Sequence, residues 1–332
     1  MRVVPVIALD ALGGDRAPDE IVAGALEATR EGIEVTLYGP ASLETGGLRL
    51  VDAPTAIDMA EKPAEAVRFK PDSSLVVAVK AVAEGSAHAI VSAGNTGAVL
   101  AAGLVHLRRQ PGVLRPAIAV VIPSSRGPSV LIDAGANADN RPEHLLQFAT
   151  MGSIFAQEVL GIAEPTVGLL SIGEEREKGN QLTLETHELL RAVPALNFSG
   201  NVESRDLLRG VTDVVVTDGF TGNIALKLIE GTSRELLAAL RAEITATWRG
   251  KLGGLLIGPA ARRLRTRLDP DTYGGAYLLG LKGLVVIAHG NSGRRAIANA
   301  IRLAARGVEN RVVERLAERL VEAAAFDAAS GA

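Results

Sequence analysis

The feature that most constrains the fold is a regular alternation of short apolar segments with longer helical patterns. Segments such as VVPVIALD, HAIVSAG, SVLIDAG, DVVVTDG and GLVVIAHG are each followed by a helix-forming stretch, and several end in Gly, Asp or Ser. Strands that are apolar throughout are typical of a parallel sheet covered by helices on both faces. The alternation therefore predicts an α/β protein with a Rossmann-like three-layer αβα arrangement and a mainly parallel sheet.

The chain shows no internal division that would separate two domains. No long linker or low-complexity stretch interrupts it, so we expect a single α/β catalytic domain over residues 1–332, with any subdomain split left open. The N-terminal MRVVPVIALD has a short apolar run without a small-residue cleavage site and is interpreted as a first strand, not a signal peptide. Residues 85–107 lack Asp, Glu, Lys and Arg, but the Gly-Asn-Thr-Gly interruption favours a strand–turn–helix over a membrane span.

Composition excludes several classes of function. The net charge of −3 and the aromatic content of 3% argue against a nucleic-acid partner. The chain has no cysteine, which excludes disulfides, thiolate zinc sites and an acyl-cysteine intermediate. This composition fits a cytoplasmic protein.

Three strand–turn–helix junctions share an unusual composition. The sequences GNTG (94–97), GFTGN (219–223) and GNSG (290–293) each deliver Gly, Asn and Thr or Ser to the start of a helix, with looser relatives that end at Asp15 and Asn137. Helix N-termini have unpaired N–H groups and the positive end of the helix dipole, so such junctions bind phosphate or carboxylate. The same residues also cap helices and form turns without any ligand. The candidate anion-binding residues are Asn95, Thr96, Gly97, Asn137, Gly222 and Asn291.

Familiar nucleotide signatures are absent from the sequence. No G-x-G-x-x-G follows the first strand, and no G-x-x-x-x-G-K-[ST] occurs. We therefore expect the junctions to hold an anion rather than a dinucleotide, and we expect no cofactor.

Two side chains at predicted strand ends are candidates for catalysis. Lys178 lies in GEEREKG, where it could reach a phosphate or a developing oxyanion; the alternative is a solvated charge cluster. His289 ends the strand LVVIAH and is the histidine best placed for proton transfer, unless it is structural. The remaining histidines show no metal spacing, and no metal is expected. Carboxylates that could support the site follow other strands: Asp10, Asp15, Asp133 and Asp218.

Residues 249–268 depart from the α/β pattern. The sequence RGKLGGLLIGPAARRLRTRL holds six basic residues and no acidic one, and Pro259 is predicted to start a short helix. An apolar loop before a basic amphipathic helix favours a protruding segment at a membrane surface, where each arginine could contribute ~1 kcal/mol. A packed helix with a solvated face or a dimer contact remains an alternative. The predicted membrane contacts are Leu252, Leu255, Leu256, Ile257, Leu264, Leu268, Arg262 and Arg263.

Several longer motifs resemble one known family. LDALGGDRAPD (9–19), SAGNTGA (92–98), LIDAGAN (131–137), IGEEREKG (172–179), TDGFTGNIALK (217–227), YGGAYLLGLKG (273–283) and AHGNSG (288–293) occur in order over nearly the whole chain. Together they resemble the PlsX-type phosphate acyltransferases. One departure is Leu12, where the family usually has methionine; this apolar exchange casts no doubt on function.

The resemblance implies a reaction and its partners. It implies transfer of an acyl group from acyl carrier protein to orthophosphate in bacterial phospholipid synthesis, with the acyl phosphate passed to a membrane glycerol-3-phosphate acyltransferase. It also implies a fold like isopropylmalate dehydrogenase and phosphate acetyltransferase, a homodimer, and peripheral association with the inner face of the cell membrane through residues 252–268.

This chemistry agrees with the candidate residues. Orthophosphate is already an anionic nucleophile, so the protein must chiefly hold it against the thioester, which can supply ~7–11 kcal/mol. We hypothesise that residues 95–97 and Asn223 cradle the phosphate. Lys178 would stabilise the phosphate or the oxyanion, a role worth ~3–4 kcal/mol, and His289 would donate a hydrogen bond or protonate the leaving thiolate.

Three alternatives remain open at this stage. They are a coenzyme A-dependent phosphate acetyltransferase, a decarboxylating hydroxyacid dehydrogenase that needs NAD and a divalent metal, and a non-catalytic scaffold at a lipid surface. The sequence also leaves open the acyl-chain length and the carrier-protein footprint, for which Arg108, Arg109, Arg115 and the arginines of 262–267 are candidates.

Overall fold

One continuous β-sheet organises the protein. The computed structural model describes residues 4–268, 272 and 274–330. Its strands are β1 (Val6–Asp10), β2 (Glu34–Gly39), β3 (Arg49–Asp52), β4 (Ala89–Ser92), β5 (Ala117–Pro123), β6 (Pro128–Ile132), β7 (Val167–Ser171), β8 (Phe198–Glu203), β9 (Val214–Val216), β10 (Ala276–Leu279) and β11 (Leu284–Ile287). They hydrogen-bond in the order β3-β2-β1-β4-β11-β10-β5-β6-β9-β7-β8.

The sheet consists of two parallel blocks that run in opposite directions. One block is β3-β2-β1-β4-β11 and the other is β6-β9-β7-β8, and all neighbours within each block are parallel. Between them, β10 is antiparallel to both β11 and β5, and β5 is antiparallel to β6. The predicted fold class is confirmed, and the structure adds that the strands of the two blocks end at opposite edges of the sheet.

Helices cover both faces of the sheet and complete three layers. One face carries α1 (Asp19–Thr29), α5 (Pro142–Leu160), α6 (Gln181–Arg191), α9 (Arg294–Glu309) and α10 (Val312–Ser330). The other carries α2 (Pro63–Phe69), α3 (Ser74–Ala83), α4 (Thr96–Ala102), the π-helical turn η1 (Gly103–Leu107) and the start of α7 (Gly219–Thr245); a 3₁₀ turn, η2 (Ser204–Asp206), follows β8. Each face therefore has its own apolar core.

Local sequence signals explain where several helices begin and end. α5 starts at Pro142, whose missing N–H costs nothing in a first turn, and ends at Gly161, which takes the left-handed conformation (φ 72°). α9 buries one apolar face, including Ile297 and Ile301, against α1 and β11. Burying each such side chain contributes about 1.5–3 kcal/mol.

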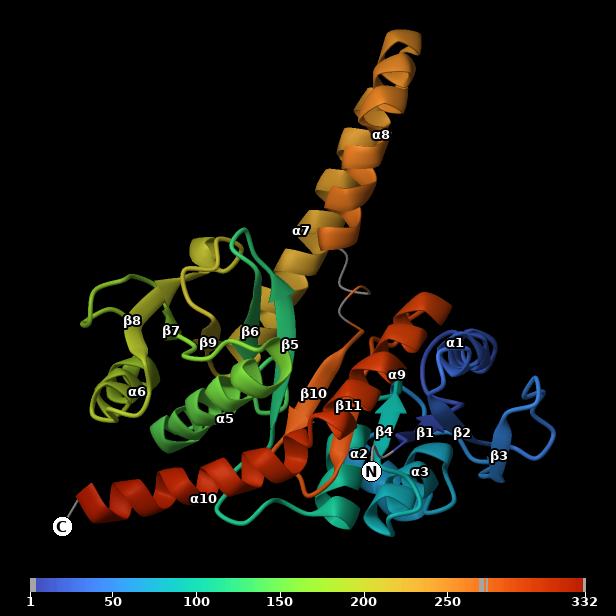
Figure 1. The fold of residues 1–332 in the computed structure, drawn as a ribbon, viewed down its shortest axis with the longest axis horizontal. Coiled ribbons are helices and arrows are strands. Elements are labelled where there is room, and N and C mark those ends of the chain that lie inside the picture. The colour runs from blue at the N-terminus through green and yellow to red at the C-terminus, as the bar shows by residue number, and fades with distance from the viewer. Residues whose placement is uncertain (1–3, 269–271, 273, 331–332) are drawn as a thin grey trace.

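Helices α7 and α8 (Trp248–Leu268) form a long hairpin that projects away from the sheet (Figure 1). The predicted helix start at Pro259 is wrong, because α8 already begins at Trp248 and passes through Pro259. Packing against α7 stabilises the turns before the proline, which sequence propensity does not reveal.

The hairpin carries the predicted membrane contacts. Leu255 and Leu256 are 77% and 85% exposed, Leu252, Ile257 and Leu264 are also exposed, and Arg262 and Arg263 lie on the solvent side. The Leu268 side chain lies outside the described part of the structure. Among the described helices, none is both long and apolar enough to cross a bilayer.

Candidate active site

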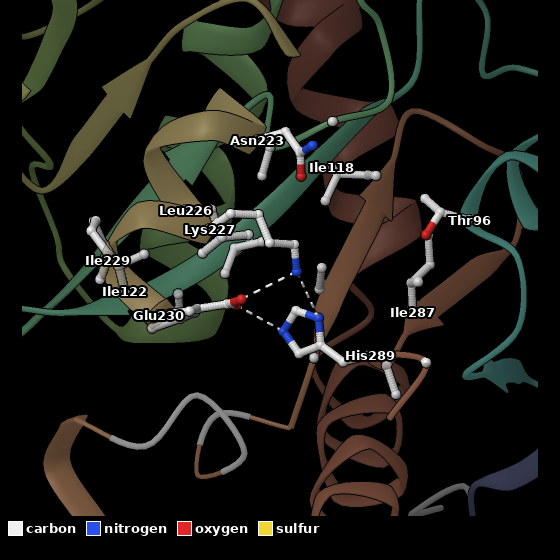
Figure 2. A pocket seen from close by; sticks show the side chains of 18 of the residues that line it. Thr96, Ile118, Ile122, Asn223, Leu226, Lys227, Ile229, Glu230, Ile287 and His289 are labelled. Carbon is white, nitrogen blue, oxygen red and sulfur yellow. Dashed lines mark hydrogen bonds and ion pairs between the residues drawn. The ribbon is translucent and has the colours of Figure 1, made fainter. Parts of the chain in front are cut away.

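A cavity of about 330 Å³, here called the inner pocket, opens at the junction of the two blocks. Its walls come from β5, β10, the end of β11, the first turns of α7 and the start of α4. Most of the lining is apolar and includes Ile118, Ile122, Leu226, Ile229 and Ile287. Five polar side chains also line it, and three of them are joined to one another (Figure 2). The five are Thr96, Asn223, Lys227, Glu230 and His289.

Lys227, Glu230 and His289 form one connected group. The Lys227 Nζ lies 3.1 Å from Glu230 Oε2 and 3.5 Å from His289 Nδ1, and His289 Nε2 lies 2.9 Å from Glu230 Oε1 (Figure 2). These contacts favour the tautomer whose Nε2–H donates to Glu230, with Nδ1 accepting from the ammonium group. The lysine thus retains a further N–H donor, and the imidazole has one unprotonated nitrogen, Nδ1, whose contact with the lysine is long at 3.5 Å.

Glu230 remains ionised although its side chain is only 10% exposed. Burial alone would raise the pKa of the carboxyl, but hydrogen bonds and charge from His289 and Lys227 outweigh it. The net pKa therefore lies below the ordinary value of 4.5. The carboxylate anchors both catalytic candidates and fixes their orientation.

The GNTG junction contributes one side chain to the inner pocket. Thr96 lines the cavity, but Asn95 is engaged elsewhere: its Oδ1 accepts from Ala98 N (3.1 Å) and its Nδ2 donates to the carbonyls of Met59 and Glu61. Gly97 packs closely on Pro63 of α2. Asn95 and Gly97 therefore position the turn that presents Thr96.

A buried carboxylate builds the turn facing Asn223. Asp133 accepts hydrogen bonds from the backbone N–H groups of residues 118, 135, 136 and 137 and from the side chain of Asn137. Burial raises the pKa of Asp133 above its ordinary value, against the opposing effect of these bonds. Gly135 in this turn lines the pocket and contacts Asn223.

The first turn of α7 packs against the same carboxylate. A Cβ at Gly222 would lie 1.9 Å from the Asp133 carbonyl oxygen, so no larger residue fits there. Asp218 caps the helix by accepting from Thr221 N at 2.9 Å. Asn137, Gly222, Asp133 and Asp218 thus form the support that presents Asn223.

Asp10 has a similar supporting position in the other block. It is buried and accepts from Ser74 Oγ (2.6 Å) and Ser92 Oγ (2.7 Å). Burial raises the pKa of its carboxyl above the ordinary value, against these hydrogen bonds. Asp10 ends β1, and its bond to Ser92 joins β1 to the end of β4. The GNTG junction follows β4.

A second hollow of about 1070 Å³, here called the outer cleft, adjoins the inner pocket. The two share Lys227, Glu230, His289, Met59 and Gly290. Asn291, predicted to bind phosphate, and Asp15, predicted to support the site, line this cleft and not the inner pocket.

Lys178 does not line either hollow in the described chain. Its side chain is exposed on the loop after β7, and its carbonyl accepts from Ser171 Oγ at 2.9 Å. The separation follows from strand order, since β7 lies beyond β6 and β9 in the sheet, away from β5 and β10, which form walls of the inner pocket.

Sequence reasoning missed Lys227 and Glu230. Lys227 follows Asn223 by four residues, and Glu230 follows Lys227 by three. These spacings place all three side chains on one face of α7. That helical spacing after the GFTGN junction is the signal that identifies them. Among the described residues, no group of three or more acidic or histidine side chains could hold a metal ion.

Known proteins with similar sequences are phosphate acyltransferases. Residues 5–315 match the model of a family described as fatty acid synthesis protein. The phosphate acyltransferase of Pelotomaculum thermopropionicum is 48% identical over 318 residues, covering 93% of both chains. That of Desulfitobacterium hafniense is 48% identical over 325 residues, covering 95% of this chain and 97% of its own.

The fold is also similar to a solved structure. A phosphotransacetylase from Streptococcus pyogenes matches with a TM-score of 0.61 at 18% identity, covering 92% of this chain and 94% of its own. At that identity the likeness concerns the arrangement of strands and helices alone.

Proposed function

The chain belongs to the fatty acid synthesis protein family, whose similar members are phosphate acyltransferases, and from that premise we propose how its two hollows divide the reaction. The donor is an acyl thioester of acyl carrier protein, and the acceptor is orthophosphate. The products are an acyl phosphate and the free carrier thiol, and the acyl phosphate serves phospholipid synthesis.

The observation that carries this proposal is a set of polar side chains in the lining of a largely apolar cavity. Lys227, His289, Thr96 and Asn223 line a pocket whose other lining side chains include several Ile, Val and Leu residues. An acyl chain would occupy the apolar part, since burying each CH₂ is worth about 0.8 kcal/mol. The thioester carbonyl would then lie next to the polar side chains.

In the proposed step, a phosphate oxygen attacks the thioester carbonyl carbon and the carbon–sulfur bond breaks. Thr96 and Asn223 orient the phosphate, and Lys227 stabilises the negative charge on the phosphate and the carbonyl oxygen. His289 takes the proton of hydrogen phosphate at Nδ1 and passes it to the leaving sulfur. One proton thus moves from phosphate to thiol, and no cofactor enters the balance.

Attack by phosphate is direct in this scheme. The chain has no cysteine, so no acyl-cysteine can form. The sequence predicted that Lys178 stabilises charge; we assign this role to Lys227 in the proposal, because Lys227 lines the inner pocket and Lys178 does not. Lys178→Ala tests the sequence-based assignment, because a full rate removes Lys178 from the mechanism.

The decisive experiment supplies purified protein with phosphate and either long-chain acyl carrier protein or acetyl-CoA, and traps acyl phosphate with hydroxylamine. We expect product from the carrier thioester and at least about tenfold less kcat/KM with acetyl-CoA, since the short group buries little of the pocket. Equal or better use of acetyl-CoA would replace this function by the coenzyme A-dependent alternative.

We also propose that the hairpin associates with the inner face of the cell membrane from the cytoplasm. Exposed Leu255 and Leu256 lie on a helix with six basic residues, and this pattern supports contact with an anionic leaflet. Such contact would bring the acyl phosphate to a membrane glycerol-3-phosphate acyltransferase. Leu255→Asp with Leu256→Asp should release the protein from sedimenting vesicles of anionic lipid, and undiminished sedimentation would contradict the assignment.

Exposed apolar residues at the base of α7 support a homodimer. Phe220, Ile224 and Leu228 are each more than half exposed and follow one another at four-residue spacing. A second copy would cover this stripe. Sedimentation equilibrium of the wild type and of Ile224→Asp measures the contact, and a monomeric wild type would contradict it.

A further inference from the structure

The outer cleft is larger than the inner pocket and is rich in arginine. It lies between one face of α7, Arg265 near the C-terminal end of α8, and the region where α9 begins beside α1. Seven cationic side chains line it, together with three acidic ones. The cations are Arg16, Lys227, Arg234, Arg241, Arg265, Arg294 and Arg295.

One face of α7 links the inner pocket to the cleft. Lys227, Glu230, Arg234 and Arg241 follow at intervals of three, four and seven residues, so they lie in a row along the helix. The first two belong to the catalytic group, and the arginines continue the row toward the hairpin tip. A molecule bound along this face would therefore reach the reacting atoms directly.

The acidic residues of the cleft neutralise only part of this charge. Glu20 is engaged by Arg294, with 2.9 Å between carboxylate and guanidinium and 2.6 Å to the Arg294 backbone N–H. Glu230 is engaged by Lys227 and His289. Arg234, Arg241, Arg265 and Arg295 have no acidic partner within 4.0 Å among the described residues. The cleft is thus strongly positive in a chain whose net charge is −3.

We propose that the outer cleft is the docking site for the acidic carrier protein that delivers the acyl thioester, with Arg234, Arg241, Arg265 and Arg295 as its principal contacts. This inference rests on the proposed function. Charge complementarity of this kind speeds association and fixes the orientation of a partner. The pantetheine group that carries the acyl thioester passes from the cleft into the inner pocket across the shared residues Lys227 and His289.

Other occupants fit the cleft less well. A second copy related by two-fold symmetry would bring the same arginines face to face, which like charges oppose. A lipid surface needs exposed apolar side chains. These are abundant on the hairpin, whereas among the residues that line the cleft Met59 is the one large apolar side chain that is exposed. Of the arginines considered from sequence, Arg109 is already engaged, donating to the carbonyls of Val113 and Leu114.

The test is charge reversal in the cleft with a matched control. Arg234→Glu/Arg241→Glu should raise KM for acyl carrier protein at least about tenfold while leaving kcat unchanged. With acyl-pantetheine, which lacks the carrier, kcat/KM should equal that of the wild type. Arg30→Glu/Arg126→Glu carries the same change in net charge on exposed arginines that line neither hollow, and it should leave every constant unchanged.

Each other outcome overturns the inference. An unchanged KM for acyl carrier protein in the charge-reversed variant excludes docking at the cleft. An equal loss of kcat/KM with acyl-pantetheine means that the arginines contact the pantetheine group and not the carrier protein. Loss of sedimentation with anionic vesicles at unchanged KM assigns them to lipid.

The docking site and the proposed function fail in distinguishable ways. If the wild type makes no acyl phosphate from either donor, the proposed function fails. Calorimetric titration of acyl carrier protein into the wild type and the Arg234→Glu/Arg241→Glu variant then tests docking by itself, because it needs no turnover. Equal affinity of the two proteins overturns the docking site.

Discussion

The inner pocket and the outer cleft lie side by side but differ in nearly every physical property. The pocket is about 330 Å³ and lined mainly by aliphatic side chains, whereas the cleft is about 1070 Å³ and lined by seven cations. Aliphatic lining favours ligands that bury apolar surface and selects among them by size. Solvated cationic lining attracts anions, and salt weakens that attraction. Under the proposed function, the pocket would hold the acyl group that is transferred, and the cleft would hold the carrier that brings it.

The boundary between the two hollows is one turn of one helix. Lys227 and Glu230, with His289 opposite, belong to both linings. An acyl thioester has an apolar end and a polar end, and only at this boundary would both ends be accommodated. The chemistry is therefore expected where the two environments meet, and its residues can be probed separately from each wall.

The largest effect is expected at the boundary itself. Lys227→Met removes the cation that both hollows share, and kcat/KM should fall by about 100-fold or more, the usual loss for one well-aimed donor to a developing charge. The rate of hydroxylamine-trapped product measures this. Lys282→Met, an exposed lysine that lines neither hollow, is the control. A variant that keeps the wild-type rate would remove Lys227 from the mechanism.

A smaller effect is expected from narrowing the inner pocket alone. Ile229→Trp fills part of the apolar wall, so kcat/KM for long acyl chains should fall about tenfold relative to short ones. Competition between two chain lengths of acyl carrier protein gives this ratio directly. Leu184→Trp, on α6 and away from both hollows, should not alter it. An unchanged ratio for Ile229→Trp would place the acyl chain elsewhere.

Salt should weaken binding at the cleft and leave the chain-length preference of the pocket unchanged. Raising NaCl from about 0.05 M to about 0.5 M shortens the Debye length severalfold, so KM for acyl carrier protein should rise severalfold. The preference between chain lengths should stay constant, because aliphatic burial is far less sensitive to this change. A shift of both quantities together would mean that the two walls do not act independently.

The smallest effect concerns the pH dependence of stability. The pKa of Glu230 is lowered in the folded protein because its charge partners outweigh burial. Its ion pairs therefore stabilise the fold at neutral pH, and this contribution disappears as the pH falls from about 4.5 through the lowered folded pKa. Glu230→Gln should lower the free energy of unfolding by about 0.5–1 kcal/mol at pH 7. Urea titrations at neutral and acidic pH test this, and an equal difference at both would contradict it.

Much of the fold was predictable from the sequence because it depends on local patterns. Apolar strands and the residues that follow them identified the α/β class and most strands. The sequence did not indicate β3, β8 or β10. β3 and β10 have only four residues each, and β3 and β8 are edge strands with polar residues. The antiparallel strands β5 and β10 reverse the second block, and nothing local in AIAVVIP or AYLL indicates direction.

Strand order, which the sequence does not reveal, limits prediction of the site. Thr96, Asn223 and His289 were expected at one site, and they line one cavity. Lys178 was expected there because it follows a strand, but β7 lies beyond β6 and β9 in the sheet, away from the strands that line the cavity. Lys227 and Glu230 escaped notice because they lie inside a helix, where charged residues most often face solvent.

The length of α7 has a mechanical consequence. The helix begins beside the inner pocket at Gly219 and ends at the hairpin tip at Thr245, so its 27 residues span about 40 Å. A helix that packs against a second helix neither shortens nor bends easily, so the distance between its two ends stays constant. Whatever the tip touches is held at a constant height from the reacting atoms, and removing seven residues from each helix would lower that height by about 10 Å.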